Sequence, residues 1–426
     1  MSPTNAPAPA GSGLARLIAP VSPRQFEDEY ADQRPLYIGR DDPGYFADLL
    51  TFDDVDRLLT LSGPNFENIR VASNGIDAII SSPENRRHEA ANRLETIYRH
   101  YRAGSTIVLN SVNERLEPLK RLERALNAEL GAGLEMNVYL TPGGQAQGFR
   151  PHYDTHDVLV LQIHGKKTWG VYGSPFPQPL PMPAQEFNTM KAILNVPAEP
   201  ERELEMRPGD VLYLPRGTVH AATSNETATV HLTIGIHRQL WFPLIQEALL
   251  EVVARDPRLR ASVPLDFART PEATAEAAEQ LRTLLGLLAE QAPVQRLLGA
   301  AAGRTAFHAS PSLRNHLSDL EALNELTDTT PVFRRPGIRY NLGVAGSSIR
   351  LEFHNKILEL PTSLAHTVAF LLNGEEKAFT TADLPAELDE TARLNLVKRL
   401  IGEGFLTLGS AGPAESSAEP AEPASE

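Results

Sequence analysis

The sequence predicts an α+β protein in which a closed β-barrel or double sheet lies between helical segments. The length of 426 residues exceeds one ordinary core and indicates two or three domains. Between residues 134 and 238 apolar residues recur with the period of two that is typical of strands, whereas the flanking segments have a helical period. Because Gly and Pro clusters separate these short strands, we predict a barrel over about residues 105–238.

The segment ahead of the barrel predicts short helices and strands. Residues 1–14 are rich in Ala, Pro and Gly and predict a disordered lead-in. Ser22 and Pro23 predict a helix N-cap with Pro at the first helical position, and this helix extends to about residue 32. The other elements predicted here are a helix capped by Thr51, helices at 84–101 and 113–130, and strands at 35–39, 69–72 and 78–81.

The barrel and the segments after it have contrasting patterns. The barrel strands are predicted at 134–141, 157–164, 168–172, 211–214 and 228–238. A helical middle rich in Ala and Leu follows, with helices at 242–254, 271–290 and 313–326, and it suits helix packing or a dimer interface. The last folded part has strands at 338–342 and 356–360 and helices at 363–372 and 389–403, an order that resembles a winged helix.

Composition excludes several classes of protein. With 42% hydrophobic and 22% charged residues the chain has the composition of a soluble globular protein. No apolar run approaches the roughly 20 residues of a membrane span, and the N-terminus lacks a secretory signal, so we expect a cytoplasmic protein without membrane association. With no Cys, disulfides and thiolate metal sites are excluded. The net charge of −14 argues against nucleic acid and is compatible with a basic polypeptide partner.

Two motifs in the barrel region carry candidate metal ligands. In the first, His152 and Asp154 are two residues apart, so in a strand an imidazole and a carboxylate share one face. The second, RPGDVLYLPRGTVH, has a turn, an apolar strand and a Pro/Gly turn that ends at His220. Two His and one carboxylate on one face of a metal form the facial triad of non-haem Fe(II) oxygenases, which leaves open positions for a 2-oxo acid and O₂.

The first motif alone would be weak evidence. His-x-Asp occurs by chance in many proteins, and a His in a strand is more often a hydrogen-bonded structural residue than a ligand. A buried strand seldom ends in Leu-Pro-x-Gly-x-x-His unless the turn directs the His to a site. Together, the two halves predict metal binding by His152, Asp154 and His220.

The barrel region resembles the JmjC-type ribosomal oxygenases, also called the cupin-4 group. The matching text is NVYLTPGGQAQGFRPHYDTHDVLVLQIHGKKTW, then RPGDVLYLPRGTVH, then VHLTIGI. The resemblance extends to domain order, and it implies a JmjC/cupin double-stranded β-helix. The predicted domains are therefore a lead-in at 1–14, the oxygenase domain at 15–240, a helical dimerisation region at 241–329, a winged-helix-like domain at 330–410 and a disordered acidic tail at 411–426.

The resemblance also implies a set of cosubstrate residues. Fe(II) is held by the triad, and Lys167 binds the distal carboxylate of 2-oxoglutarate, although strand parity cannot choose it over Lys166 because a turn near Gly165 intervenes. Asn137 and Tyr139 share a strand face and are expected to line the pocket; the alternative is that Tyr139 is barrel core. Two further positions are Thr233, which matches a pocket residue, and Gly235, where the family pattern has a hydroxyl residue.

Other candidate residues have simpler interpretations. His156 is in register with Asp154, but two His and one Asp already complete the site. Trp169 is expected to pack in the barrel, and Arg216 is either solvated or at the barrel mouth. The helix at 389–403 has three basic residues, with Glu387 and Asp389 before it, which argues against DNA binding.

These observations predict an Fe(II)- and 2-oxoglutarate-dependent dioxygenase that hydroxylates a polypeptide. The resemblance implies an Arg or His side chain in a ribosomal protein as substrate, and a homodimer. Three alternatives remain open: a hydroxylase of a biosynthetic precursor peptide, a non-catalytic JmjC-like scaffold, and a Zn or Mn cupin that performs hydrolysis or isomerisation.

Overall fold

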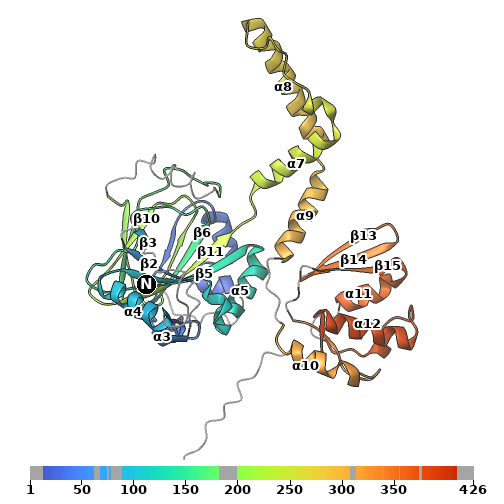
Figure 1. The fold of residues 1–426 in the computed structure, drawn as a ribbon, viewed down its shortest axis with the longest axis horizontal. Helices are drawn as coiled ribbons and strands as arrows, with labels where there is room; N and C mark the ends of the chain where they lie inside the picture. Colours follow the sequence, from blue (N-terminus) through green and yellow to red (C-terminus); the bar gives the residue numbers. More distant parts are fainter. Residues whose placement is uncertain are drawn as a thin grey trace, which may run out of the picture. The chain divides into compact units, whose positions relative to one another are not determined.

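The computed structural model describes residues 13–61, 68–73, 76–77, 89–181, 199–307, 313–336, 338, 340–354, 356–373 and 377–409. The chain divides into two compact units, Met1–Gln239 and Leu240–Glu426 (Figure 1). The strand predicted at 78–81, the first residues of the helix predicted at 84–101, residues 1–12 of the lead-in and the tail at 411–426 lie outside the described residues.

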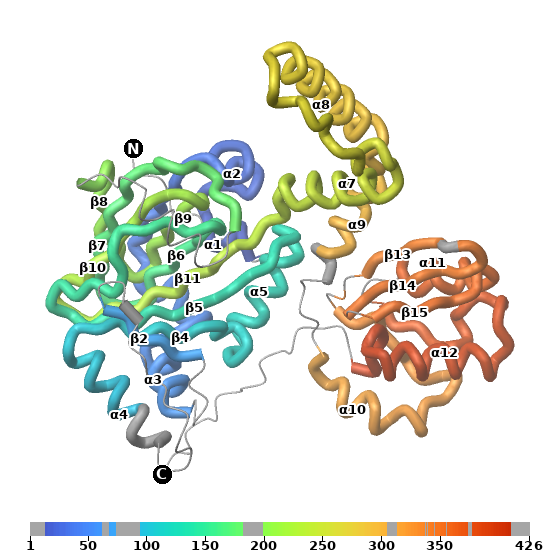
Figure 2. Tube along the Cα trace, turned by 45° about the horizontal axis from the view of Figure 1, so that its top comes forward, coloured from blue at the N-terminus to red at the C-terminus, as the bar shows by residue number. Residues whose placement is uncertain are grey.

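Two antiparallel sheets form the centre of the first unit (Figure 2). The larger has the strand order β1-β9-β6-β11-β5-β4-β2-β3, and the smaller has the order β10-β7-β8. Their bounds are β1 Leu36–Ile38, β2 Ile69–Ser73, β3 Ile76–Asp77, β4 Thr106–Leu109, β5 Gly133–Thr141, β6 Asp157–His164, β7 Lys167–Val171, β8 Arg202–Met206, β9 Val211–Leu214, β10 His220–Ser224 and β11 Thr229–His237.

Strand β6 shows how the sequence builds a sheet that is buried on both faces. Val158 and Val160 point to one face and join a small apolar cluster with residues of β7, β8 and β9. Leu159 and Leu161 point to the other face and join the main core, to which the N-terminal helices contribute. A strand with both faces covered is apolar at successive positions instead of alternating, which is the pattern seen here.

The helices of the first unit cover the outer face of the larger sheet. They are α1 Gly13–Ile18, α2 Pro23–Glu29, α3 Phe52–Leu61, α4 Glu89–Arg102 and α5 Glu117–Leu130. Ser22 caps α2 as predicted, because its hydroxyl accepts a hydrogen bond from the Gln25 N–H at 3.1 Å. The helix predicted at 113–130 is in fact a 3₁₀ turn, Val112–Glu114, followed by α5.

The second unit has two groups of elements. The first is α7 Trp241–Arg255, α8 Pro271–Gln291 and α9 Val294–Phe307. The second is α10 His316–Glu321, α11 Ala365–Asn373, α12 Glu390–Gly402 and the strands β12 Phe333–Arg334, β13 Asn341–Ala345, β14 Ser348–Phe353, β15 Lys356–Pro361 and β16 Leu406–Thr407. A separate apolar core holds the second group together. None of the described helices is long and apolar enough to cross a membrane.

Several elements were not predicted from the sequence. Strand β8 reads RELEM, and it lies at the edge of the smaller sheet, where most of its side chains remain in solvent and no apolar pattern is needed. Strand β10 reads HAATS, which lacks the large apolar residues typical of strands. Strands β4 and β14 and helix α9 were also missed, and the helix predicted at 313–326 is reduced to α10 and a 3₁₀ turn.

Candidate metal and cosubstrate site

Backbone hydrogen bonds bring the two metal-binding motifs together. The N–H of His152 donates to the carbonyl of His220 at 3.0 Å, and the N–H of His220 donates to the carbonyl of His152 at 2.8 Å. The N–H of Gly217 donates to the carbonyl of Asp154 at 2.9 Å. The apolar strand β9 pairs with β1 and β6, while His220 begins β10 and pairs with His152 itself. The two motifs are therefore adjacent segments of backbone.

The turn before His220 depends on a glycine and on a buried carboxylate. Gly217 has φ +87°, and a Cβ there would lie 2.4 Å from the Phe176 carbonyl oxygen. Asp157 accepts hydrogen bonds from the Tyr213 hydroxyl at 2.9 Å and from the Arg216 N–H at 3.0 Å. Burial raises the pKa of Asp157. These contacts fix the loop between β9 and β10, which sets the position of His220.

The side chains of His152, Asp154 and His220 converge as predicted. Their ligand atoms all lie within 4.8 Å of one another, and Nε2 of His220 is 3.6 Å from Oδ2 of Asp154. Nδ1 of His152 is 2.8 Å from the Arg150 carbonyl oxygen, and Nδ1 of His220 is 3.0 Å from that of Thr218. These carbonyls favour the tautomer with hydrogen on Nδ1, so Nε2 of each ring is the metal-binding nitrogen.

This donor set fits iron. Two imidazoles and one carboxylate, with backbone carbonyls orienting the rings, match the ligands that non-haem Fe(II) uses when three positions stay open. The same residues border a cavity of about 250 Å³. A bidentate small molecule could therefore reach a metal held by this triad.

A buried lysine also lines this cavity. Lys167 is only 4% exposed, and its Nζ donates a hydrogen bond to Oγ1 of Thr141 at 3.0 Å. Oγ1 of Thr141 is in turn 3.0 Å from Oγ1 of Thr106. Burial lowers the pKa of Lys167 to about 7, since these neighbours are neutral hydroxyls. An ammonium in such a site is stabilised by an anionic ligand.

Strand register explains why Lys167 and not Lys166 occupies this position. Gly165 has φ +64°, which turns the chain before β7 begins at Lys167. From there the parity is regular, so Lys167, Trp169 and Val171 are the buried residues of β7. Lys166 instead lies at the surface, where its Nζ is 3.4 Å from Oε1 of Glu205.

The other predicted pocket residues divide into two groups. Tyr139 and Thr233 line the cavity. Asn137 is not among its lining residues; its Oδ1 accepts from the Ser111 N–H at 3.0 Å, and its Nδ2 donates to Oε1 of Glu135 at 3.0 Å. The cosubstrate role expected for Asn137 stays a prediction.

Two residues that the sequence analysis did not place in the site also line the cavity. The His231 ring stacks on Tyr139 at 4.8 Å and contacts Trp169 edge to face at 5.3 Å. Within the described part of the chain, Nδ1 of His231 and Nε1 of Trp169 are buried without a hydrogen-bond partner. Burial and nearby Lys167 hold the pKa of His231 well below its usual value. The period of two from Thr233 to His231 is the signal that could have identified this residue.

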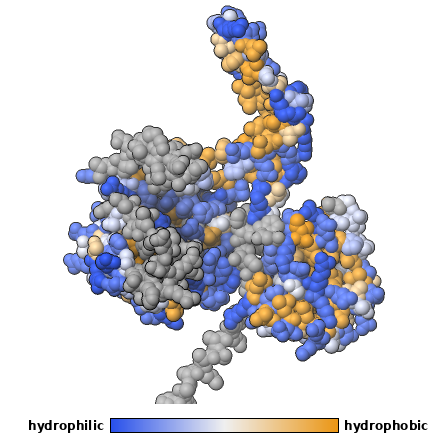
Figure 3. Space-filling view, viewed as in Figure 1, coloured by the Kyte–Doolittle hydropathy of each residue, from blue (hydrophilic) through white to orange (hydrophobic). Residues whose placement is uncertain are grey.

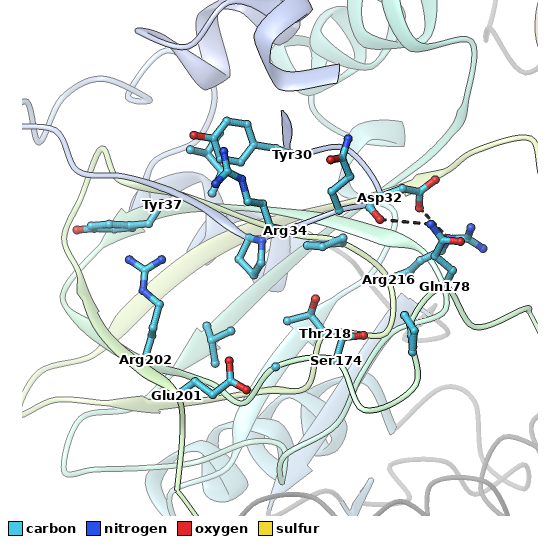
Figure 4. A pocket seen from close by; sticks show the side chains of 17 residues that line it. Tyr30, Asp32, Arg34, Tyr37, Ser174, Gln178, Glu201, Arg202, Arg216 and Thr218 are labelled. Carbon is cyan, nitrogen blue, oxygen red and sulfur yellow. Dashed lines mark hydrogen bonds and ion pairs between the residues drawn. The ribbon is translucent and has the colours of Figure 1, made fainter. Parts of the chain in front are cut away.

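A second, larger cavity of about 470 Å³ lies elsewhere in the first unit (Figure 4). Arg216 lines this cavity, where its Nε donates to Oδ1 of Asp32 at 3.0 Å. It is therefore neither simply solvated nor at the mouth of the metal cavity. Tyr30, Arg34 and Arg202 also point into the region shown.

Comparisons with known proteins show what this chain is similar to. Residues 111–243 match the model of the JmjC domain. The bifunctional lysine-specific demethylase and histidyl-hydroxylase NO66 of Dictyostelium discoideum is 27% identical over 92% of this chain and 82% of its own length. Ribosomal oxygenase 2 of Bos taurus is 28% identical over 84% of this chain and 74% of its own. Residues 111–243 therefore form a JmjC domain, and the chain is similar over most of its length to proteins named ribosomal oxygenase or histidyl-hydroxylase.

Other similarities are more partial or more distant. The NO66 protein of Drosophila persimilis is 30% identical over 60% of this chain, and the match covers 36% of that protein. The Escherichia coli YcfD structure covers 90% of this chain and 97% of its own, with 18% identity and a TM-score of 0.48. The JmjC match spans both ligand motifs and Lys167.

Proposed function

We propose that this chain is an Fe(II)- and 2-oxoglutarate-dependent oxygenase that hydroxylates an Arg or His side chain of a ribosomal protein. One observation carries the proposal. The triad of His152, Asp154 and His220 and the buried ammonium of Lys167 line the same cavity of about 250 Å³. A small dicarboxylate suits such a cavity, because its 2-oxo acid group can chelate the metal and its distal carboxylate can pair with the cation.

The residues of the cavity have separate roles in this proposal. When bound, iron and 2-oxoglutarate supply the oxidising chemistry that converts a C–H bond into an alcohol. His152, Asp154 and His220 would hold the metal, and the ammonium of Lys167 would pair with the distal carboxylate. The hydroxyl groups of Thr141 and Thr106 orient that ammonium. The surrounding apolar side chains exclude water.

The relatives support a ribosomal protein as substrate. The matched proteins are named ribosomal oxygenase 2 and histidyl-hydroxylase, and the first two discussed above are matched over most of their length. The buried Lys167 disfavours a Zn or Mn hydrolase, because simple hydrolysis has no use for a cation in that position. A hydroxylase of a biosynthetic precursor peptide would share the same cavity, and only its product distinguishes it.

The proposal is tested by following product and cosubstrate together. The protein is incubated with Fe(II), 2-oxoglutarate, O₂ and ribosomal proteins stripped from ribosomes. We expect a 16 Da increase on one Arg or His, matched by succinate, and loss of both with His152→Ala. A mass increase that persists in His152→Ala, or succinate formation that no ribosomal protein stimulates, contradicts this function.

The exposed apolar residues of the helical group support a homodimer. Helix α8 has 21 residues, none of them buried, and Leu281 and Leu285 on it are 58% and 56% exposed. Figure 3 shows apolar residues, in orange, gathered along this helix at the top of the view. A second copy of the same helix would cover this surface, because two-fold interfaces are self-complementary.

The second group of elements in unit Leu240–Glu426 supports a winged-helix-like module at 330–410 only in part. Helices α11 and α12 follow a three-stranded meander, β13-β14-β15, and short strands β12 and β16 pair beside them. Asp389 caps α12 by accepting from the Ala392 N–H, so this acidic residue serves the helix itself. The exclusion of DNA, the cytoplasmic location and the exact module limits stay predictions.

A further inference from the structure

The face of the larger sheet that lines the metal cavity continues outward beyond it. On β11 this face carries His231, Thr233, Gly235 and His237 in order, since side chains alternate along a strand. The register pairs His231 with Tyr139, Thr233 with Asn137 and Gly235 with Glu135 on β5. The first pair is buried or half-buried within the cavity, whereas His237 and Glu135 have side chains 47% and 46% exposed. The ladder therefore leads from the cavity to solvent.

A histidine from the next strand covers this outer part of the ladder. A Cβ built on Gly235 would lie 3.0 Å from both Cδ2 and Nε2 of His156, so the His156 ring occupies the space that a side chain at 235 would take. The same ring contacts that of His237, with centroids 4.5 Å apart and the ring planes tilted by 32°. His156 precedes Val158 and Val160, the two residues of β6 that line the cavity. The half-buried ring is thus the next group outward from Val158 on the same face, at the level of Gly235 on β11.

A carboxylate lies beside these rings. Oε2 of Glu135 is 3.9 Å from Nε2 of His237, and its Oε1 accepts from the Asn137 amide. At nearly half exposure, Glu135 retains room for an additional donor. The carboxylate of Glu135 and the ring of His156 both lie next to His237. A carboxylate near an aromatic ring matches a guanidinium, which donates two parallel hydrogen bonds to a carboxylate and stacks on flat rings. An imidazole substrate would gain less, because it offers fewer donors and carries a full charge only when protonated.

We propose that His156 and Glu135 form a substrate subsite that selects an arginine side chain. This inference rests on the proposed function, and it chooses between the two side chains that the function leaves open. The guanidinium stacks on the His156 ring and pairs with the Glu135 carboxylate. The absence of a side chain at Gly235 is what allows His156 to take this position.

The test measures binding, so it does not depend on turnover. The chain of 426 residues is loaded with Mn(II) and 2-oxoglutarate under argon, and binding of 2-oxoglutarate is verified first by calorimetry. The probe is N-acetyl-Gly-Arg-Gly amide, and the matched probe carries citrulline, which has the same shape without the charge. Proton NMR gives the affinity, and paramagnetic broadening of the central side chain reports its distance from Mn(II).

We expect the arginine probe to bind about fivefold more tightly than the citrulline probe, with broadening of its side-chain protons. Glu135→Gln should remove the difference between the probes. His156→Ala should weaken both probes about threefold, because both present a planar group to the ring. Gly235→Ala should have a similar effect, since its methyl group displaces the His156 ring. Glu203→Gln, an exposed carboxylate on β8, is the matched control and should change nothing.

Three outcomes would distinguish failure of the proposed function from failure of the arginine subsite alone. If 2-oxoglutarate does not bind in the presence of Mn(II), the proposed function fails and this inference fails with it. If 2-oxoglutarate binds but the two probes bind equally, or Glu135→Gln keeps their difference, the subsite alone is contradicted. Probe binding without paramagnetic broadening also contradicts it, because the binding site would then lie away from the metal.

Discussion

At the scale of single residues, Lys167 is the clearest sign that the cavity binds an anion. The side chain is 4% exposed and its Nζ has the neutral Thr141 hydroxyl as hydrogen-bond acceptor. An uncompensated buried charge opposes folding, and a carboxylate ligand offsets that cost. A lysine in such a place therefore favours ligand binding and not stability.

The substitution Lys167→Met separates these two effects. We expect the affinity for 2-oxoglutarate in the presence of Mn(II) to fall at least about a hundredfold, because a buried ion pair loses one partner. The melting temperature without 2-oxoglutarate should stay the same or rise. Calorimetry and thermal unfolding measure the two quantities. Lys166→Met is the control, since that lysine is half-exposed at the surface, and it should leave both unchanged. A normal affinity in Lys167→Met would remove this residue from the site.

The lowered pKa of Lys167 predicts how cosubstrate affinity depends on pH. With a pKa of about 7 in the ligand-free protein, the amine is mostly neutral above pH 8. A bound carboxylate favours the charged form, so binding above pH 7 requires uptake of a proton. The affinity for 2-oxoglutarate should therefore fall up to about tenfold per pH unit between pH 8 and 9.5. With Mn(II), 2-oxobutyrate should show no such slope, because it lacks the distal carboxylate; equal slopes would contradict the assignment.

Some residues of the site could be predicted from the sequence and others could not. The ligands His152, Asp154 and His220 were predicted from motif spacing, and the structure brings them within 4.8 Å. The choice of Lys167 came from the resemblance, since the positive φ of Gly165 hides the strand parity. His231 was not predicted, although it lies two residues from Thr233 on the same strand face; its contact with Trp169 of the other sheet could not be seen in the sequence.

At the scale of elements, the turn between β9 and β10 is what makes the metal site. Gly217 combines a positive φ with a carbonyl 2.4 Å from where a Cβ would be, so no other residue fits without movement. The apolar barrel strands β5, β6, β7, β9 and β11 were predicted, whereas β8 and β10 were not. The latter are held by pairing with β7, a long-range interaction that local sequence does not reveal.

The substitution Gly217→Ala should therefore impair metal binding more than folding. We expect Mn(II) affinity to fall by at least about tenfold, and the free energy of unfolding to fall by about 1–3 kcal/mol, as the strained turn shifts His220. Gly299→Ala in the exposed part of α9 is the control, where nothing lies within 4 Å of the new methyl group. That variant should be neutral or slightly more stable. Metal affinity unchanged in Gly217→Ala would show that the turn does not position the ligand.

At the scale of the whole molecule, the two units have different features: one contains the metal cavity and the other has exposed apolar helices. The first unit, Met1–Gln239, contains all the described residues that line the metal cavity. The second unit contributes the apolar surface of α7 and α8, including Ile245, Leu281 and Leu285. Its Ala- and Leu-rich helical pattern predicted an association surface, but amphipathicity alone does not identify the partner.

The homodimer predicts a change in molecular mass. The double variant Leu281→Asp with Leu285→Asp should sediment as a monomer, because charge in an apolar interface is strongly unfavourable. Analytical ultracentrifugation at several concentrations measures this. Leu342→Asp makes the same exchange at an exposed position of β13, and it should remain dimeric. A monomeric wild-type protein at all concentrations would contradict the dimer without affecting the oxygenase site.

The central claim is that one small molecule binds both the metal of the triad and Lys167. The most direct measurement is the visible charge-transfer absorption that forms when a 2-oxo acid chelates Fe(II), recorded under argon. We predict that 2-oxoglutarate produces this absorption with the wild-type protein, that Asp154→Ala abolishes it, and that Lys167→Met requires far more 2-oxoglutarate while its response to 2-oxobutyrate is unchanged. Absence of the absorption in the wild-type protein, or its persistence in Asp154→Ala, would contradict the account.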